Sequence, residues 1–153
     1  MNMQAKVIRR YLEPALALAF VVAGTPAASE EAGAVFKKCL AKASIATELS
    51  SCIGLLTSAC RAEREIRGED VRDGECESSE AYAWGFLSEQ VGGAQSEIVP
   101  LLMSYRDALC GLASAQAQDA DRLVAVAVCE RDITAQYAIL LVGILDPDGA
   151  GLD

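Results

Sequence analysis

The chain has 153 residues, with 13 lysines and arginines against 22 aspartates and glutamates, six cysteines and no histidine. This length allows one domain, and the lack of histidine excludes Ser-His-Asp and Cys-His nucleophiles and any zinc site with an imidazole ligand. The formal net charge of -9 argues against a nucleic-acid partner, because binding phosphates requires a basic surface. Composition therefore indicates a small acidic protein with a binding or structural role.

Residues 1–27 have the layout of a secretory signal peptide. Three basic residues come first, the apolar stretch Ala15–Ala23 follows, and the small residues Thr25 and Ala27 suggest cleavage after Ala27. The alternative is an uncleaved membrane anchor, but a span needs about 20 apolar residues, roughly twice this stretch. We therefore expect a periplasmic or secreted protein without a membrane segment after cleavage. The cleaved chain keeps ten basic and 21 acidic residues, a formal charge of -11.

Apolar residues recur every three or four positions along the remaining chain, and strand signals are scarce. This spacing predicts five helices, over residues 31–43, 47–64, 76–91, about 98–112 and 120–145. Gly68 and Gly74 lie in the acidic segment 61–80 and predict a loop in at least its middle. Pro100 should lie in the first turn of the fourth helix, where its missing N–H is harmless.

All six cysteines lie beyond the predicted signal peptide, at Cys39, Cys52, Cys60, Cys76, Cys110 and Cys129. An even number in an exported chain indicates a disulfide framework, although six cysteines allow 15 pairings. Each consecutive pair brackets a likely turn, and residues equidistant from the turn of an antiparallel helix hairpin lie side by side. We therefore predict the bridges Cys39–Cys52, Cys60–Cys76 and Cys110–Cys129. Short metal-binding or redox spacings such as C-x-x-C do not occur.

Together these patterns predict an all-α fold, a small disulfide-stapled bundle of about four to five helices arranged as antiparallel hairpins. A single helical domain would span residues 28–146. The sequence DPDGAGLD at the end of the chain should stop the last helix at Asp146. Residues 147–153 would then form a loose C-terminal tail.

Two segments of the chain resemble the LprI-type lysozyme-inhibitor domain family in its six-cysteine variant. One is CLAKASIATELSSC at 39–52, and the other is YRDALC at 105–110, with Cys129 and Ile133-Thr134 at the positions that follow in the family. Cys60, and Cys76 with Glu80 and Trp84, also fit, so that the resemblance covers most of residues 36–141. The chain departs from the family at Gly85, where an Asp usually follows the Trp, and at Leu102, where a Trp is frequent. The resemblance implies an exported, mostly helical domain that in some members inhibits lysozyme.

The acidic loop is the candidate partner-binding surface, with Glu69, Asp70, Asp73, Glu75 and Glu77. Lysozymes are commonly cationic, so an acidic loop held by disulfides would be steered to one and occlude its cleft. The alternative is an ordinary solvated loop in an acidic protein.

The motif of Tyr105, Arg106 and Asp107, together with Trp84, is expected to be structural. Adjacent helical positions point about 100° apart, so the three consecutive residues cannot all face one site. Arg106 would pair with an acid on a neighbouring helix and lock the hairpin near Cys110. The alternative for this motif is direct contact with a partner.

An enzyme is the competing class, because paired carboxylates can hydrolyse glycosides. Glu80 and Asp107 are an imaginable pair, and Tyr82 with Trp84 an imaginable sugar platform, but nothing in the sequence selects them. We therefore expect a non-enzymatic protein without cofactor or metal, acting as a lysozyme inhibitor. The alternative is an envelope interaction or assembly protein with another target, for which the alanine-rich helix face around Ala113 and Ala115 offers a packing surface.

Overall fold

The computed structural model describes residues 30–43, 46–92, 97–119 and 121–145. Within these ranges every regular element is helical, which confirms the predicted all-α fold. The elements in chain order are α2 (Glu30–Lys42), α3 (Ala46–Leu49), the 3₁₀ turn η1 (Ser50–Cys52), α4 (Leu55–Ile66), α5 (Glu75–Val91), α6 (Ile98–Gln116) and α7 (Arg122–Leu145). None of the described helices is long and apolar enough to cross a membrane. The predicted signal peptide and tail lie outside the described residues.

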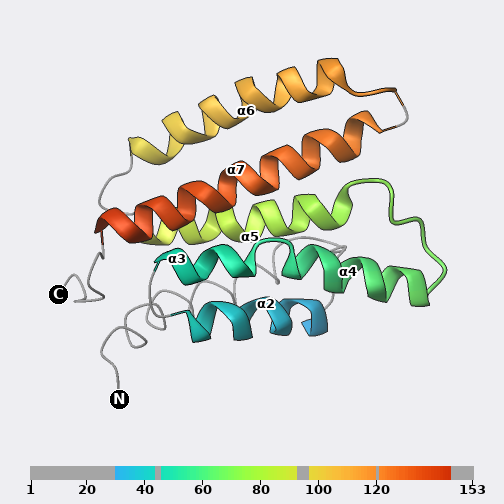
Figure 1. The fold of residues 1–153 in the computed structure, drawn as a ribbon, viewed down its shortest axis with the longest axis horizontal. Coiled ribbons are helices and arrows are strands. Elements are labelled where there is room, and N and C mark those ends of the chain that lie inside the picture. The colour runs from blue at the N-terminus through green and yellow to red at the C-terminus, as the bar shows by residue number, and fades with distance from the viewer. Residues whose placement is uncertain (1–29, 44–45, 93–96, 120, 146–153) are drawn as a thin grey trace.

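The helices are stacked, with α6 at one side of the molecule and α2 at the other (Figure 1). The main helix pairs are α6 with α7, α7 with α5, α5 with α4 and α4 with α2. Helix α7 therefore lies between α5 and α6, and α6 contacts the rest of the described molecule chiefly through α7. Pro100 is the third residue of α6, within the first turn as predicted.

Three disulfides join neighbouring elements of the stack, in the pairs Cys39–Cys52, Cys60–Cys76 and Cys110–Cys129. All three are the pairs that the spacing of the cysteines predicted. The first bridge joins α2 to η1, the second α4 to α5, and the third α6 to α7. Each bridge closes a short loop and is expected to stabilise the fold by about 2–4 kcal/mol, mainly by restricting the unfolded chain.

The hydrophobic core lies between α2, α4, α5 and α7. At its centre the rings of Phe36 and Trp84 meet edge to face, with their centroids 5.1 Å apart. Both side chains are fully buried. Helix α7 contributes the buried alanines Ala135 and Ala138, whose small side chains allow α5 and α7 to approach closely. Trp84 is thus a core residue and not an exposed platform for a sugar.

The predicted continuous helix over 47–64 was wrong, because it is interrupted between Cys52 and Leu55. Gly54 has φ of 84°, in the left-handed region that glycine adopts without strain. The Gly54 N–H donates to Glu80 Oε1 at 2.5 Å, and the Thr57 N–H donates to Glu80 Oε2 at 2.7 Å. A carboxylate from α5 therefore caps the first turn of α4, satisfying N–H groups that have no partner within their own helix.

Candidate functional site

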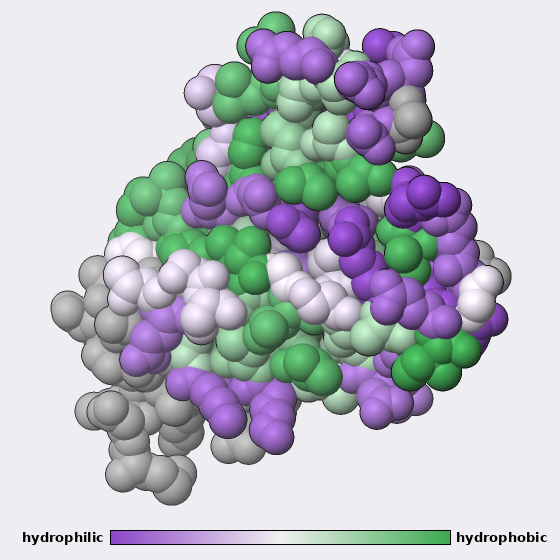
Figure 2. All heavy atoms as spheres, turned by 45° about the vertical axis from the view of Figure 1, so that its right-hand side comes forward, coloured by the Kyte–Doolittle hydropathy of each residue, from purple (hydrophilic) through white to green (hydrophobic). Residues whose placement is uncertain are grey.

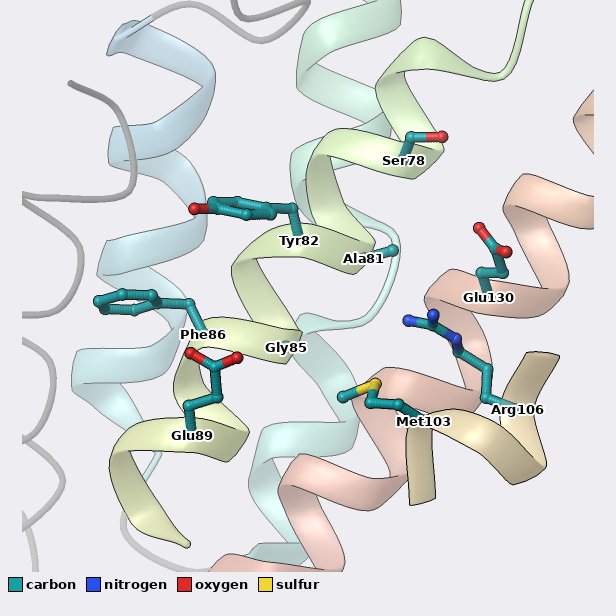
Figure 3. A pocket seen from close by; sticks show the side chains of 9 residues that line it. All are labelled: Ser78, Ala81, Tyr82, Gly85, Phe86, Glu89, Met103, Arg106 and Glu130. Atoms are coloured by element: carbon teal, nitrogen blue, oxygen red, sulfur yellow. The ribbon is translucent and has the colours of Figure 1, made fainter. Parts of the chain in front are cut away.

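A cleft of about 340 Å³ opens between α5, α6 and α7. It is lined by Ser78, Ala81, Tyr82, Gly85, Phe86 and Glu89 from α5, Met103 and Arg106 from α6, and Glu130 from α7. Figure 3 shows that Met103 and Arg106 approach from one side while α5 forms the opposite wall. The volume falls within the range of natural ligand sites, and the lining combines rings, a thioether and a few charged groups.

The charges in this cleft do not cancel. Arg106 donates from Nε and Nη2 to Asp107 Oδ1 at 2.9 and 2.6 Å, and from Nη1 to Thr134 Oγ1 at 3.3 Å. Its positive charge is therefore compensated by Asp107. The side-chain carboxylates of Glu89 and Glu130, in contrast, have no ion-pair partner among the described residues. The uncompensated charge of the cleft is negative, and it suits a cationic group.

Gly85 leaves space on the wall of the cleft. It lies within α5, where glycine is less favourable than alanine by about 0.5–1 kcal/mol. A Cβ at this position would meet only Thr134 Cγ2 at 3.7 Å and Met103 Cε at 4.0 Å, both ordinary contacts. Neither packing nor backbone conformation requires glycine here. The residue costs helix stability and keeps the volume beside Met103 open.

The acidic loop is neutralised by arginines from within its own segment. The buried side chain of Arg64 pairs with Glu69 at 3.1 Å, Asp73 at 2.7 Å and Glu75 at 3.0 Å. Arg67 also binds Glu69, and Arg72 binds Asp70. Four acidic residues thus share three guanidinium groups, so that this surface carries much less net charge than the sequence suggested.

Hydrogen bonds and ion pairs within this loop lower three carboxyl pKa values. The hydrogen bond from Arg67, supported by Arg64, holds the pKa of Glu69 below its usual range. The backbone N–H of Arg72 does the same for Asp70. Partial burial pushes the pKa of Asp73 upward, but the hydrogen bond from Arg64, the backbone N–H of Glu75 and the charge of Arg64 together outweigh this effect and lower it overall. The loop is therefore built as a structural network that requires ionised acids.

Two other acidic residues that the sequence singled out, Glu77 and Glu80, are buried. Glu77 is 1 % exposed and pairs with Arg61, so its side chain cannot face a partner. Glu80 is fully buried and also accepts a hydrogen bond from Trp84 Nε1 at 3.2 Å. Glu80 caps α4, whereas Asp107 is exposed and pairs with Arg106. The two carboxylates considered as a catalytic pair therefore make separate structural contacts.

The consecutive residues Tyr105, Arg106 and Asp107 point in different directions, as helical geometry predicted. Tyr105 is 57 % exposed, and its ring lies 6.5 Å from that of Tyr137. Arg106 turns inward toward α7, where its partner is the hydroxyl of Thr134. The prediction that Arg106 pairs with an acid on a neighbouring helix was wrong, since its acidic partner is Asp107 on the same helix.

The sequence did not predict this cleft. Its free acids, Glu89 and Glu130, are 41 positions apart in the chain and line one cleft only because α5 packs on α7, where they lie toward opposite ends of it (Figure 3). The one sequence signal was Gly85, which stands in the middle of an otherwise good helical segment. The described residues hold no group of three or more acidic or cysteine side chains arranged to bind a metal ion.

Comparisons with known proteins give no relative for this chain. No protein-family model matches it, and neither a curated protein nor a solved structure does.

Proposed function

We propose that this chain is an exported, non-enzymatic binding protein that receives a basic side chain of a partner protein in the cleft between α5, α6 and α7. The observation that carries the proposal is that the cleft is lined by two uncompensated carboxylates, Glu89 toward one end and Glu130 toward the other (Figure 3). Lysine and arginine are the side chains that such a site suits, because carboxylates attract their charge and accept their hydrogen bonds.

Export is supported by the predicted signal peptide and by the three disulfides, which form and persist in oxidising compartments. A formal charge of -11 on the cleaved chain would steer a cationic protein toward it. The cleft would then supply the short-range contact that long-range attraction lacks.

A lysozyme is the partner to test first, because the resemblance to the LprI-type family and the cationic nature of lysozymes both favour it. In this proposal the acidic loop contributes less than the cleft does, since Arg64, Arg67 and Arg72 already compensate its exposed acids. The alternative is another cationic envelope protein, bound by the same cleft without inhibition of lysozyme.

The test is lysis of bacterial cell walls by a panel of lysozymes, with the oxidised chain lacking residues 1–27 added at physiological salt. Specific inhibition should persist as salt rises, whereas attraction by net charge alone should fade. The double substitution Glu89→Gln and Glu130→Gln should weaken inhibition about tenfold. The matched control is Glu65→Gln combined with Glu97→Gln, which removes the same charge at exposed positions outside the cleft.

Different results would overturn different parts of the proposal. If a folded sample inhibits no lysozyme, the lysozyme partner is wrong and the envelope alternative takes its place. If the cleft and control variants weaken inhibition equally, binding depends on net charge and the cleft is not the site. Gly85→Ala adds a second check, because it should reduce binding by filling the cleft while leaving the charge unchanged.

A further inference from the structure

Helices α5 and α7 run parallel and in register along the cleft (Figure 1). A Cβ on Gly85 would lie 3.7 Å from Thr134 Cγ2 of α7. A Cβ on Gly92 would lie 3.7 Å from Leu141 Cδ1. Seven residues separate the two contacts on each helix. The Gly85–Thr134 contact therefore marks a common level from which positions on both helices can be counted.

The two free carboxylates of the cleft lie on opposite sides of this level. Glu89 is four residues beyond Gly85 in α5, whereas Glu130 is four residues before Thr134 in α7. At about 1.5 Å per residue, these eight residues place the two acids about 12 Å apart along the helix axes. Figure 3 shows them toward opposite ends of the cleft. A single ammonium or guanidinium group is therefore too small to pair with both.

The middle of the cleft holds a cation. The Arg106 guanidinium donates to Thr134 Oγ1 at 3.3 Å, at the level of Gly85. Its partner Asp107 is not among the residues that line the cleft. Gly85 leaves space beside the guanidinium, because it has no side chain. The cleft thus presents a carboxylate at each end and, between them, room for a small uncharged group.

An extended segment of protein chain has the dimensions that match this arrangement. Its residues rise about 3.3 Å each and point alternately to opposite sides, so side chains four positions apart share one side at a distance of about 13 Å. The residue midway between them also points to that side. A cleft of about 340 Å³ has room for one such segment but not for a helix, which is about 10 Å across.

We propose that the cleft recognises an extended segment of its partner with basic residues at positions i and i+4 and a small uncharged residue at i+2. One basic side chain pairs with Glu89 and the other with Glu130, while the middle residue lies beside Gly85. A basic residue at i+2 would meet Arg106 and is disfavoured. This inference rests on the proposed function, because it names the chemistry that the same cleft selects in its partner.

Net charge alone would not give this selectivity. Hydrophilic residues, which include the charged ones, are spread over the face of the molecule that Figure 2 shows instead of being gathered in one place. Attraction between this acidic chain and a basic segment is therefore general, and it weakens as salt rises. A decisive test compares peptides that carry the same charge at different spacings.

The probes are short peptides of identical composition that form no stable helix in water. GSKSSSKSG has lysines at i and i+4, GSKSKSSSG at i and i+2, and GSKSSKSSG at i and i+3. Binding to the oxidised chain lacking residues 1–27 is followed by nuclear magnetic resonance titration at physiological salt. The first peptide should bind about fivefold more tightly than the other two, because only its lysines match the separation of the two carboxylates.

A third lysine separates spacing from net charge. GSKSKSKSG places this lysine at i+2, where it faces Arg106. GSKKSSKSG places the same charge at i+1, where it points away from the cleft. The two peptides have equal composition, and the second should bind about fivefold more tightly than the first.

Charge reversal in the chain shows which acid meets each end of the segment. Glu89→Lys should weaken binding of GSKSSSKSG and favour one of the two peptides GSESSSKSG and GSKSSSESG. Glu130→Lys should favour the other one, because the segment binds in a single direction. The control is Glu65→Lys, the same change at an exposed position outside the cleft, which should favour neither peptide.

The proposal is overturned if no peptide binds, if all spacings bind equally, or if lysine at i+2 strengthens binding. It is also overturned if both charge reversals favour the same peptide. Where binding is equal at all spacings but falls in the Glu89→Gln and Glu130→Gln variants, only this inference fails. Where those variants change nothing, the proposed function fails as well. A negative lysis assay with the expected order of peptides refutes only the lysozyme partner.

Discussion

Replacing Glu80 by glutamine probes the contact that connects α4 to α5. The Glu80 carboxylate is fully buried and accepts hydrogen bonds from the N–H groups of Gly54 and Thr57 and from the indole of Trp84. Glu80→Gln keeps the size and shape of the side chain. However, it replaces one acceptor oxygen by an NH₂ group, which is a donor. At least one of the three N–H groups that bind Glu80 must then face a donor.

The cost follows from the number and kind of these hydrogen bonds. A hydrogen bond to a charged group contributes about 1.5–3 kcal/mol, and an unpaired buried N–H costs about 1–3 kcal/mol. Glutamine can retain one strong acceptor contact, so we expect Glu80→Gln to lower the free energy of unfolding by about 2–4 kcal/mol. For a chain of this size that corresponds to a fall in Tm of roughly 10 °C.

The measurement is urea unfolding of the oxidised chain, followed by far-ultraviolet circular dichroism. Glu89→Gln is the matched control, since Glu89 lies on the same helix but is exposed and lies outside the hydrophobic core. The control should change stability by less than about 0.5 kcal/mol. A Glu80→Gln chain as stable as the control would refute the reasoning, because the capping contacts would then contribute nothing.

Three other predictions concern the loop, a glycine and a disulfide. Arg64→Gln should lower the free energy of unfolding by about 1–2 kcal/mol at pH 7, because three acids lose a shared partner. Gly54→Ala should cost about 1–2 kcal/mol, since φ of 84° strains any residue with a Cβ even where space is open. Replacing Cys110 and Cys129 by serine should cost roughly 3 kcal/mol and accelerate amide hydrogen exchange mainly in α6. Urea titrations measure the first two, and exchange followed by mass spectrometry measures the third.

The Arg64 variant also carries a pH dependence with a defined sign. The pKa values of Glu69, Asp70 and Asp73 are lowered in the folded chain. Their stabilisation is therefore complete above the ordinary carboxyl pKa and is lost as the pH falls through the lowered values. The parent chain should lose stability on acidification from about pH 5, and Arg64→Gln should flatten this loss. An unchanged pH profile would contradict the role given to Arg64.

The predictions for Gly54 and for the Cys110–Cys129 bridge can also be refuted. If Gly54→Ala stabilises the chain, as we expect for Gly85→Ala within α5, then the left-handed conformation of Gly54 carries no strain for alanine. If removing the Cys110–Cys129 bridge accelerates exchange evenly in all helices, α6 is not the element that this bridge holds in place.

Much of the fold followed from local patterns. The three- and four-residue spacing of apolar side chains placed five helical segments, and Pro100 fell in a first turn because only there is its missing N–H harmless. The disulfides were predictable because consecutive cysteines bracket the turns of antiparallel hairpins. The interruption at Gly54 was not predictable, because the carboxylate that stabilises it comes from Glu80, 26 positions away.

The candidate site depended on packing from the start. The sequence showed an acidic loop but not that Arg64 compensates it, since only the turn from α4 into α5 places that guanidinium among three carboxylates. It showed Glu89 and Glu130 as two ordinary acids, and their common cleft exists only because α5 and α6 both pack on α7. By itself the sequence determined the helices, the disulfides and the charge of the chain, which depend on short-range patterns and composition. The tertiary structure alone decided which charges are compensated and which are free, because that depends on distances between segments far apart in the chain.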